Sequence, residues 1–116
     1  MINIKDILIG SGFYLIAHCF TWFQLNSQFF SKWAKDHWII LTLVTSPIIG
    51  LIFVWGTRVI YSGFGNLWSG RILGFCIGNI VFALLTWLIM NEGVNLKTWV
   101  SLGLCLIIIG IQLLWK

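Results

Sequence analysis

The charged residues of this 116-residue chain are confined to the ends of four long apolar segments. Residues 7–25, 38–57, 72–90 and 98–115 contain no Asp, Glu, Lys or Arg, and all ten charged side chains (7 basic and 3 acidic) lie between or beyond them. A helix needs about 20 apolar residues to cross a bilayer core, and in lipid only helices and closed barrels satisfy their own backbone. The pattern predicts an all-α integral membrane protein in which residues 1–116 form a single domain of four transmembrane helices.

The composition agrees with a lipid environment and argues against several other classes of protein. Hydrophobic residues make up 59% of the chain and charged residues only 9%, whereas a typical soluble domain is about 25% charged. The net charge of +4 comes from scattered basic residues that form no patch, which argues against nucleic-acid binding. Cys19, Cys76 and Cys105 lie inside apolar segments without CxxC spacing, so we expect packing residues, with no disulfide framework, metal site or cofactor.

Three local features interrupt the apolar pattern. Pro47 lies in the middle of the second segment and removes a helical hydrogen bond, so we expect a kink or local unwinding there. Residues 62–70 (SGFGNLWSG) are rich in glycine and are predicted to form a flexible loop. Residues 26–37 (NSQFFSKWAKDH) mix aromatic and charged side chains, which predicts an interfacial connection that extends the first helix.

The distribution of basic residues leaves the orientation of the chain open. Four spans place four basic residues on one side of the membrane (Lys5, Arg58, Arg71 and Lys116) and three on the other (Lys32, Lys35 and Lys97). This difference gives the positive-inside rule little to act on. Either a partner or the first helix sets the orientation, or the chain inserts both ways and forms an antiparallel pair. We expect a bacterial inner membrane, with which the absence of glycosylation sequons and of a cleavable signal is compatible.

Regularly spaced glycines predict close helix packing in two places. Gly70, Gly74 and Gly78 recur every four residues at the start of the third segment, a pattern that lets another backbone approach closely. Gly103 and Gly110 are seven residues apart in the fourth segment, which brings them to nearly the same face. Because four short spans enclose no large cavity by themselves, we expect the chain to self-associate, and the glycines are candidates for the contact.

A polar stripe on the first segment marks a candidate substrate pathway. Ser11, Tyr14, His18 and Thr21 are three or four residues apart, which keeps them on one helix face directed away from lipid. Ionisable residues at depth are costly and usually functional, so we expect His18 to contact a ligand or sense protons in a central cavity. The alternative is a neutral histidine hydrogen-bonded to a neighbouring helix. Further candidates for the pathway are Trp22, Trp55 and Asn79. The alternative is that these side chains only pack against neighbouring helices or lie at the membrane interface.

The remaining charged groups suggest headgroup contacts and no catalysis. Arg58 and Arg71 flank the glycine-rich stretch and are candidates to hold a phosphate or lipid headgroup, the alternative being an interfacial anchor. No Ser-His-Asp set, HExxH motif or phosphate-binding loop occurs. The only carboxylates, Asp6, Asp36 and Glu92, lie at the ends of spans, so paired acid–base chemistry inside the membrane is not available. We therefore do not expect an enzyme.

The last third of the chain resembles the drug/metabolite transporter superfamily. The stretch NIVFALLTWLIMNEGVNLKTWVSLGLCLIIIGIQLL is similar to the final two helices of that superfamily, with Glu92, Lys97, Gly103 and Gly110 on its pattern. The glycine spacing resembles the seven-residue motif by which the small multidrug resistance branch pairs through its fourth helix. The front half is weakly similar to an uncharacterised four-helix family of the same superfamily. The resemblance implies a four-helix fold, a dimer and a mid-membrane cavity between protomers.

One departure from that branch affects the expected mechanism. Small multidrug resistance proteins exchange protons for cations through a glutamate in the middle of the first helix, where this chain has Tyr14 and His18. We therefore do not expect proton-coupled export of cations by that mechanism. The function we expect is that of a small transporter or flippase that moves a small or lipid-linked molecule across the membrane as a dimer. The alternative, motivated by the missing acid, is a non-transporting accessory subunit of a larger membrane complex.

Overall fold

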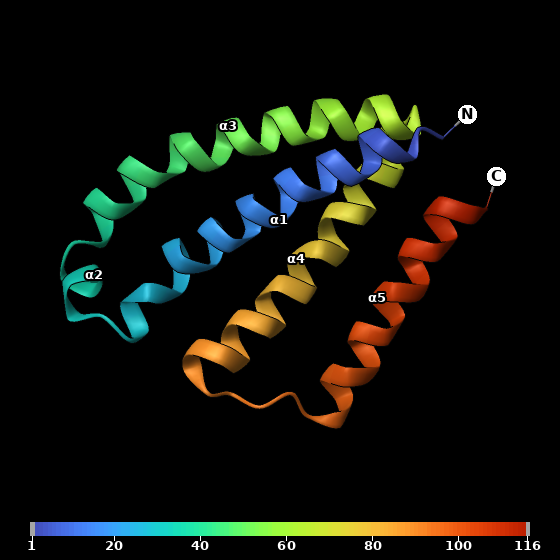
Figure 1. The fold of residues 1–116 in the computed structure, drawn as a ribbon. Helices are drawn as coiled ribbons and strands as arrows, with labels where there is room; N and C mark the ends of the chain where they lie inside the picture. Colours follow the sequence, from blue (N-terminus) through green and yellow to red (C-terminus); the bar gives the residue numbers. More distant parts are fainter. Residues whose placement is uncertain (1, 116) are drawn as a thin grey trace.

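The computed structural model describes residues 2–115, which are helical along almost their whole length (Figure 1). The chain runs through α1 (Ile4–Asn26), a short 3-10 helix η1 (Ser27–Phe29), α2 (Lys32–Asp36), α3 (Trp38–Phe64), α4 (Leu67–Met90) and α5 (Leu96–Leu114). The four long helices are long and apolar enough to cross a membrane. The predicted all-α integral membrane protein with four spans is confirmed to this extent.

Helix α1 occupies the centre of the arrangement. Helices α3 and α4 both pack against it, whereas α5 packs chiefly against α4 at the edge of the molecule (Figure 1). The ends of α1 and α3 are joined directly, because the Asn3 backbone N–H donates to the Gly63 carbonyl at 2.8 Å. The beginning of α1 and the end of α5 lie on the same side, next to the α3–α4 connection (Figure 1). An even number of spans produces this placement.

The glycine-rich stretch 62–70 is mostly helical, so the prediction of a flexible nine-residue loop is wrong. Helix α3 continues to Phe64, and Gly65 ends it in the left-handed conformation (φ 77°), which glycine adopts without steric cost. Asn66 then caps α4 by accepting a hydrogen bond from the Ser69 backbone N–H at 2.9 Å. Only residues 65 and 66 lie between the two helices, and α3 and α4 diverge from this tight turn like the arms of a V (Figure 1).

Pro47 lies inside α3 without interrupting it. The expected local unwinding is therefore not found, although the proline leaves the carbonyl four residues earlier without its usual donor. Polar side chains gather at this level: Gln24 of α1 donates to the hydroxyls of Thr45 and Ser46, at 2.8 Å in each case. These bonds join α1 to α3 beside the proline.

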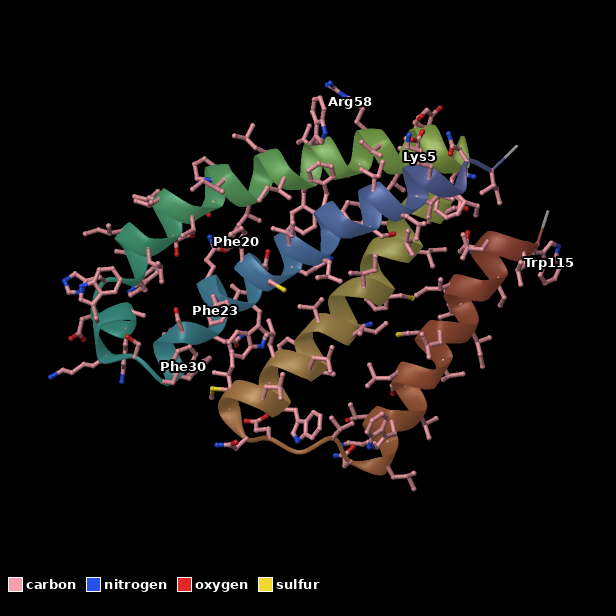
Figure 2. The ribbon with its side chains drawn as sticks, in the orientation of Figure 1. Lys5, Phe20, Phe23, Phe30, Arg58 and Trp115 are labelled. Atoms are coloured by element: carbon pink, nitrogen blue, oxygen red, sulfur yellow. The ribbon has the colours of Figure 1, made fainter. Side chains whose placement is uncertain are left out.

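Apolar side chains cover most of the molecular surface (Figure 2). The buried core is small and follows α1, where it meets α3 and α4; it consists of Ile7, Tyr14, Ile60, Phe64, Leu73, Ile77 and Val81. Helix α5 contributes little to the core, since Cys105 is its single buried residue. Such a distribution suits a chain whose solvent is lipid, because lipid-facing side chains are as apolar as packed ones.

Candidate functional site

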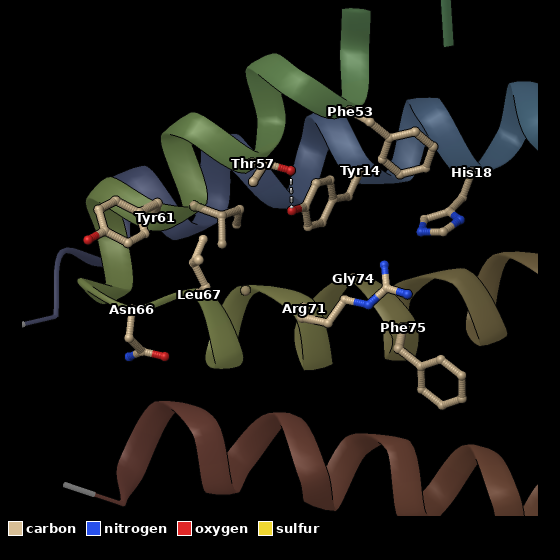
Figure 3. Close-up of a pocket in the computed structure, with 12 residues that line it drawn as sticks. Tyr14, His18, Phe53, Thr57, Tyr61, Asn66, Leu67, Arg71, Gly74 and Phe75 are labelled. Atoms are coloured by element: carbon tan, nitrogen blue, oxygen red, sulfur yellow. Dashed lines mark hydrogen bonds between the residues drawn. The ribbon is translucent and has the colours of Figure 1, made fainter. Parts of the chain in front are cut away.

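A cavity of about 580 Å³ lies between α1, α3 and α4 (Figure 3). Helix α1 provides Tyr14 and His18, and the remaining lining residues come from α3, α4 and the turn between them: Phe53, Thr57, Ile60, Tyr61, Asn66, Leu67, Gly70, Arg71, Gly74 and Phe75. The V formed by α3 and α4 diverges from the tight turn at residues 65–66 and leaves this space open. The cavity is therefore built within one copy of the chain.

Tyr14 is held in a fixed position at the wall of the cavity. A Cβ atom on Gly56 of α3 would lie 3.1 Å from the ring atom Cδ1, and one on Gly74 of α4 would lie 3.0 Å from Cε2 on the other side of the ring. The ring is thus packed between the backbones of α3 and α4, which can approach it so closely because Gly56 and Gly74 have no side chain. Its hydroxyl is hydrogen-bonded to Oγ1 of Thr57 at 2.8 Å, so the polar end of Tyr14 faces α3.

His18 lies one helical turn further along α1, on the same face as Tyr14. Its ring packs against Gly78, where an added Cβ would lie 2.7 Å from Cε1, and meets Phe53 edge-on at a centroid distance of 5.1 Å. The Nε2 atom is buried and has no hydrogen-bond partner among the described residues. Buried polar atoms in native proteins are nearly always paired, and this nitrogen, which has almost no accessible surface, is an exception among the described residues.

Among residues 2–115, Arg71 supplies the only charged side chain that lines the cavity. It projects from the first turns of α4, and Figure 3 shows its guanidinium turned toward the part of the cavity that Phe53 and His18 form. Arg58 lies elsewhere: it covers the ring of Trp55 at 5.2 Å on the outer side of α3 (Figure 2). Arg58 and Arg71, which the sequence suggests as two headgroup contacts, therefore lie in different places. Of the two, only Arg71 lines the cavity together with Tyr14 and His18.

Two other pathway candidates on α1 do not line this cavity. The Trp22 side chain is buried, and its Nε1–H donates to Oγ1 of Thr86 on α4 at 3.0 Å. The Thr21 hydroxyl donates to the Ala17 carbonyl of its own helix at 2.8 Å. Trp22 thus joins α1 to α4 and has a packing role in the described structure.

Trp55 and Asn79 also lie outside the cavity. The Trp55 side chain is 50% exposed on the outer side of α3. Asn79 faces α5, where its side-chain amide donates to the sulfur of Cys105 at 3.8 Å. Both residues were chosen from the sequence as polar or aromatic groups within spans, and the rotation of each helix about its axis places them elsewhere.

The sequence interpretation missed the residues that α3 contributes. Phe53, Thr57 and Tyr61 all line the cavity, and their spacing of four places them on one helix face. This periodicity was a usable signal. The sequence prediction ends the second span at residue 57, which leaves Tyr61 outside it.

The two glycine sets have different surroundings. A Cβ on Gly70 would lie 2.7 Å from Cγ2 of Ile60, and Gly74 and Gly78 contact Tyr14 and His18 as described above. The stripe on α4 therefore packs within the chain, against α1 and α3. Added Cβ atoms on Gly103 and Gly110 of α5 would meet nothing within 4 Å, so that face is open.

The cavity offers hydrogen-bond donors, one positive charge and aromatic surface. In residues 2–115, no cluster of three or more His, Cys, Asp or Glu side chains could hold a metal ion. Comparison with protein-family models, with curated proteins and with solved structures found no match to this chain.

Proposed function

We propose that the chain is a small transporter or flippase whose substrate pathway passes through the cavity between α1, α3 and α4. The observation that supports this most is the cluster of Tyr14, His18 and Arg71 around one space inside the spanning part of the molecule. Polar and ionisable groups at this depth are expensive in lipid and usually serve a pathway. His18 places an ionisable ring in the wall of that pathway, one helical turn from Tyr14.

The packing around the site favours movement of α3 against α4. These two helices contact each other little beyond their shared turn, while both pack on α1. A change in the angle of the V would widen or narrow the cavity without unfolding any helix, which is the way hinged elements move.

We propose further that the chain acts as a dimer through α5, as its resemblance to small multidrug resistance proteins implies. The open face of Gly103 and Gly110 supports this, because it lets a second backbone approach closely. Helix α5 lies at the edge of the molecule, with only Cys105 buried (Figure 1). A pair of chains joined there leaves both cavities intact.

Reconstitution into proteoliposomes tests the proposed function. A panel of fluorescent lipids and amphiphiles with cationic, zwitterionic and anionic headgroups is placed in the membrane, and their movement between leaflets is followed by dithionite quenching. We expect at least one probe to move with the wild-type protein and to slow severalfold with His18→Gln. Trp55→Phe, which alters an aromatic residue outside the cavity, is the matched control and should leave the rate unchanged.

Two results would contradict this proposal. If no probe of any headgroup class moves, or if His18→Gln and Trp55→Phe behave alike, the cavity is not a transport pathway. Copurification of a stoichiometric larger partner from native membranes, together with the absence of movement, would favour the accessory-subunit alternative.

A further inference from the structure

The charge of the cavity discriminates between classes of substrate. Arg71 lines it, and none of the three carboxylates does. The nearest of these along the fold, Asp6, is engaged at the outer end of α1 and α3, where it accepts a hydrogen bond from the Ser62 hydroxyl at 2.7 Å and another from Asn3. A positive charge without an acidic neighbour in the same cavity attracts anions and repels cations, and the low dielectric of the membrane strengthens both effects.

The lining groups are also ordered along the length of the cavity. Figure 3 shows Tyr61 and Asn66 at the end next to the α3–α4 turn, Arg71 further along, and Phe53 and Phe75 deeper. Tyr61 and Asn66 thus occupy the end nearest the α3–α4 turn, while the Arg71 guanidinium reaches toward the deep part of the cavity, where Phe53 and His18 lie. The cavity therefore places one positive charge beside aromatic side chains, which suits a molecule with one anionic head and an apolar chain.

The mouth of the cavity is formed by exposed side chains of α3 and α4. Tyr61 is 50% exposed, Leu67 67% and Phe75 66%. Because Leu67 and Phe75 are apolar and lie on spanning helices, the opening between them faces lipid. A ligand with an acyl chain can therefore enter sideways from the bilayer and keep its tail in the hydrocarbon.

We infer that the substrate is an amphiphilic anion, carrying a phosphate group on an apolar chain, and that Arg71 binds the phosphate. The inference rests on the proposed transport function, whose cavity it uses. Guanidinium and phosphate groups form paired, charge-assisted hydrogen bonds, which makes arginine the side chain best suited to this contact. Tyr14 and His18 line the part of the cavity toward which the guanidinium points, and the apolar chain lies along Phe53 and Phe75.

Binding and movement of chain-labelled lipids test this inference together. Purified protein is examined by native mass spectrometry with phosphatidic acid, phosphatidylcholine and a cationic ethylphosphatidylcholine, and the same three headgroups are used in the dithionite assay. Inorganic phosphate is added as a competitor. The variants are Arg71→Gln, Arg71→Lys and, as matched control, Arg58→Gln, which removes the arginine on the outer side of α3.

We expect phosphatidic acid to bind about tenfold or more tightly than phosphatidylcholine. Arg71→Gln should abolish this preference, Arg71→Lys should retain part of it, and Arg58→Gln should leave it intact. Equal binding of the cationic lipid, or equal losses in Arg71→Gln and Arg58→Gln, would overturn the inference. Displacement by inorganic phosphate would overturn it too, because the site would then recognise the free anion.

The two proposals fail in different ways. Arg71-dependent binding of phosphatidic acid without movement between leaflets would support the assigned ligand class and contradict the transport function. Movement of all three headgroups at equal rates would support transport and contradict the anionic ligand.

Discussion

The hydroxyl of Tyr14 on α1 and Oγ1 of Thr57 on α3 lie 2.8 Å apart and are hydrogen-bonded. This bond crosses the contact between two spanning helices at the wall of the cavity. The ring that carries the hydroxyl is gripped by Gly56 and Gly74, so one side chain connects α1 to both of its neighbours. Tyr14 is therefore a structural as well as a lining residue, and the two roles can be separated by experiment.

The Tyr14–Thr57 bond should contribute measurably to stability. Tyr14→Phe and Thr57→Val each remove one partner and keep the shape of the side chain. Hydrogen bonds between membrane helices contribute about 0.6 kcal/mol on average and up to about 2 kcal/mol. A double-mutant cycle of unfolding in sodium dodecyl sulfate should give a coupling energy in that range. Strictly additive effects would show that the bond is absent in the micelle.

Gly63 of α3 lies against the backbone of α1, so we expect that it cannot be replaced by a residue with a side chain without loss of stability. A Cβ on Gly63 would lie 2.6 Å from Cγ1 of Ile7 and 3.0 Å from the Ile7 backbone nitrogen. Because this backbone cannot rotate away, we expect Gly63→Ala to lower the free energy of unfolding by about 1 to 3 kcal/mol. Gly50→Ala, on the same helix with nothing within 4 Å, is the control and should not destabilise. Equal effects on thermal unfolding would argue against the α1–α3 contact.

Substitutions of Trp22 and Trp55, which both lie within spans, should differ in their effect on stability. Trp22 is 3% exposed and its indole nitrogen donates to Thr86, whereas Trp55 is half exposed to lipid. We expect Trp22→Leu to destabilise by about 2 to 4 kcal/mol, since it leaves both a cavity and an unpaired hydroxyl. Trp55→Leu should be nearly neutral. Chemical unfolding in micelles measures both, and a reversed order would show that α1 is rotated differently.

Substitutions on the open face of α5 should affect assembly but not the fold. Gly103→Leu and Gly110→Leu add bulk where no neighbour within the chain lies. We expect cross-linked dimers in proteoliposomes to decrease severalfold, with an unchanged far-ultraviolet circular dichroism spectrum. The control is Leu104→Phe, which enlarges an exposed residue about 100° away around the helix axis. Dimers that persist in both glycine variants would contradict pairing through α5.

The candidate site was only partly predictable from the sequence. Tyr14 and His18 were found through their spacing on one helix, which is a local property. Arg71 was selected together with Arg58, and only the fold separated the cavity arginine from the one that covers Trp55. The turn at Gly65 and Asn66 was misjudged because glycine content suggests a loop. In the structure, Gly63 and Gly70 instead pack inside helices against Ile7 and Ile60.

The sequence by itself determined the four spans, because the partition of each segment between water and lipid depends on that segment's own composition. Only the tertiary structure decided which face of each helix is buried. Lipid tails are as apolar as a packed protein interior, so hydropathy carries no information about that choice. Shape and hydrogen bonding decide which faces are buried instead. Glycines leave room for the rings of Tyr14 and His18, and the Trp22 indole donates a hydrogen bond to Thr86.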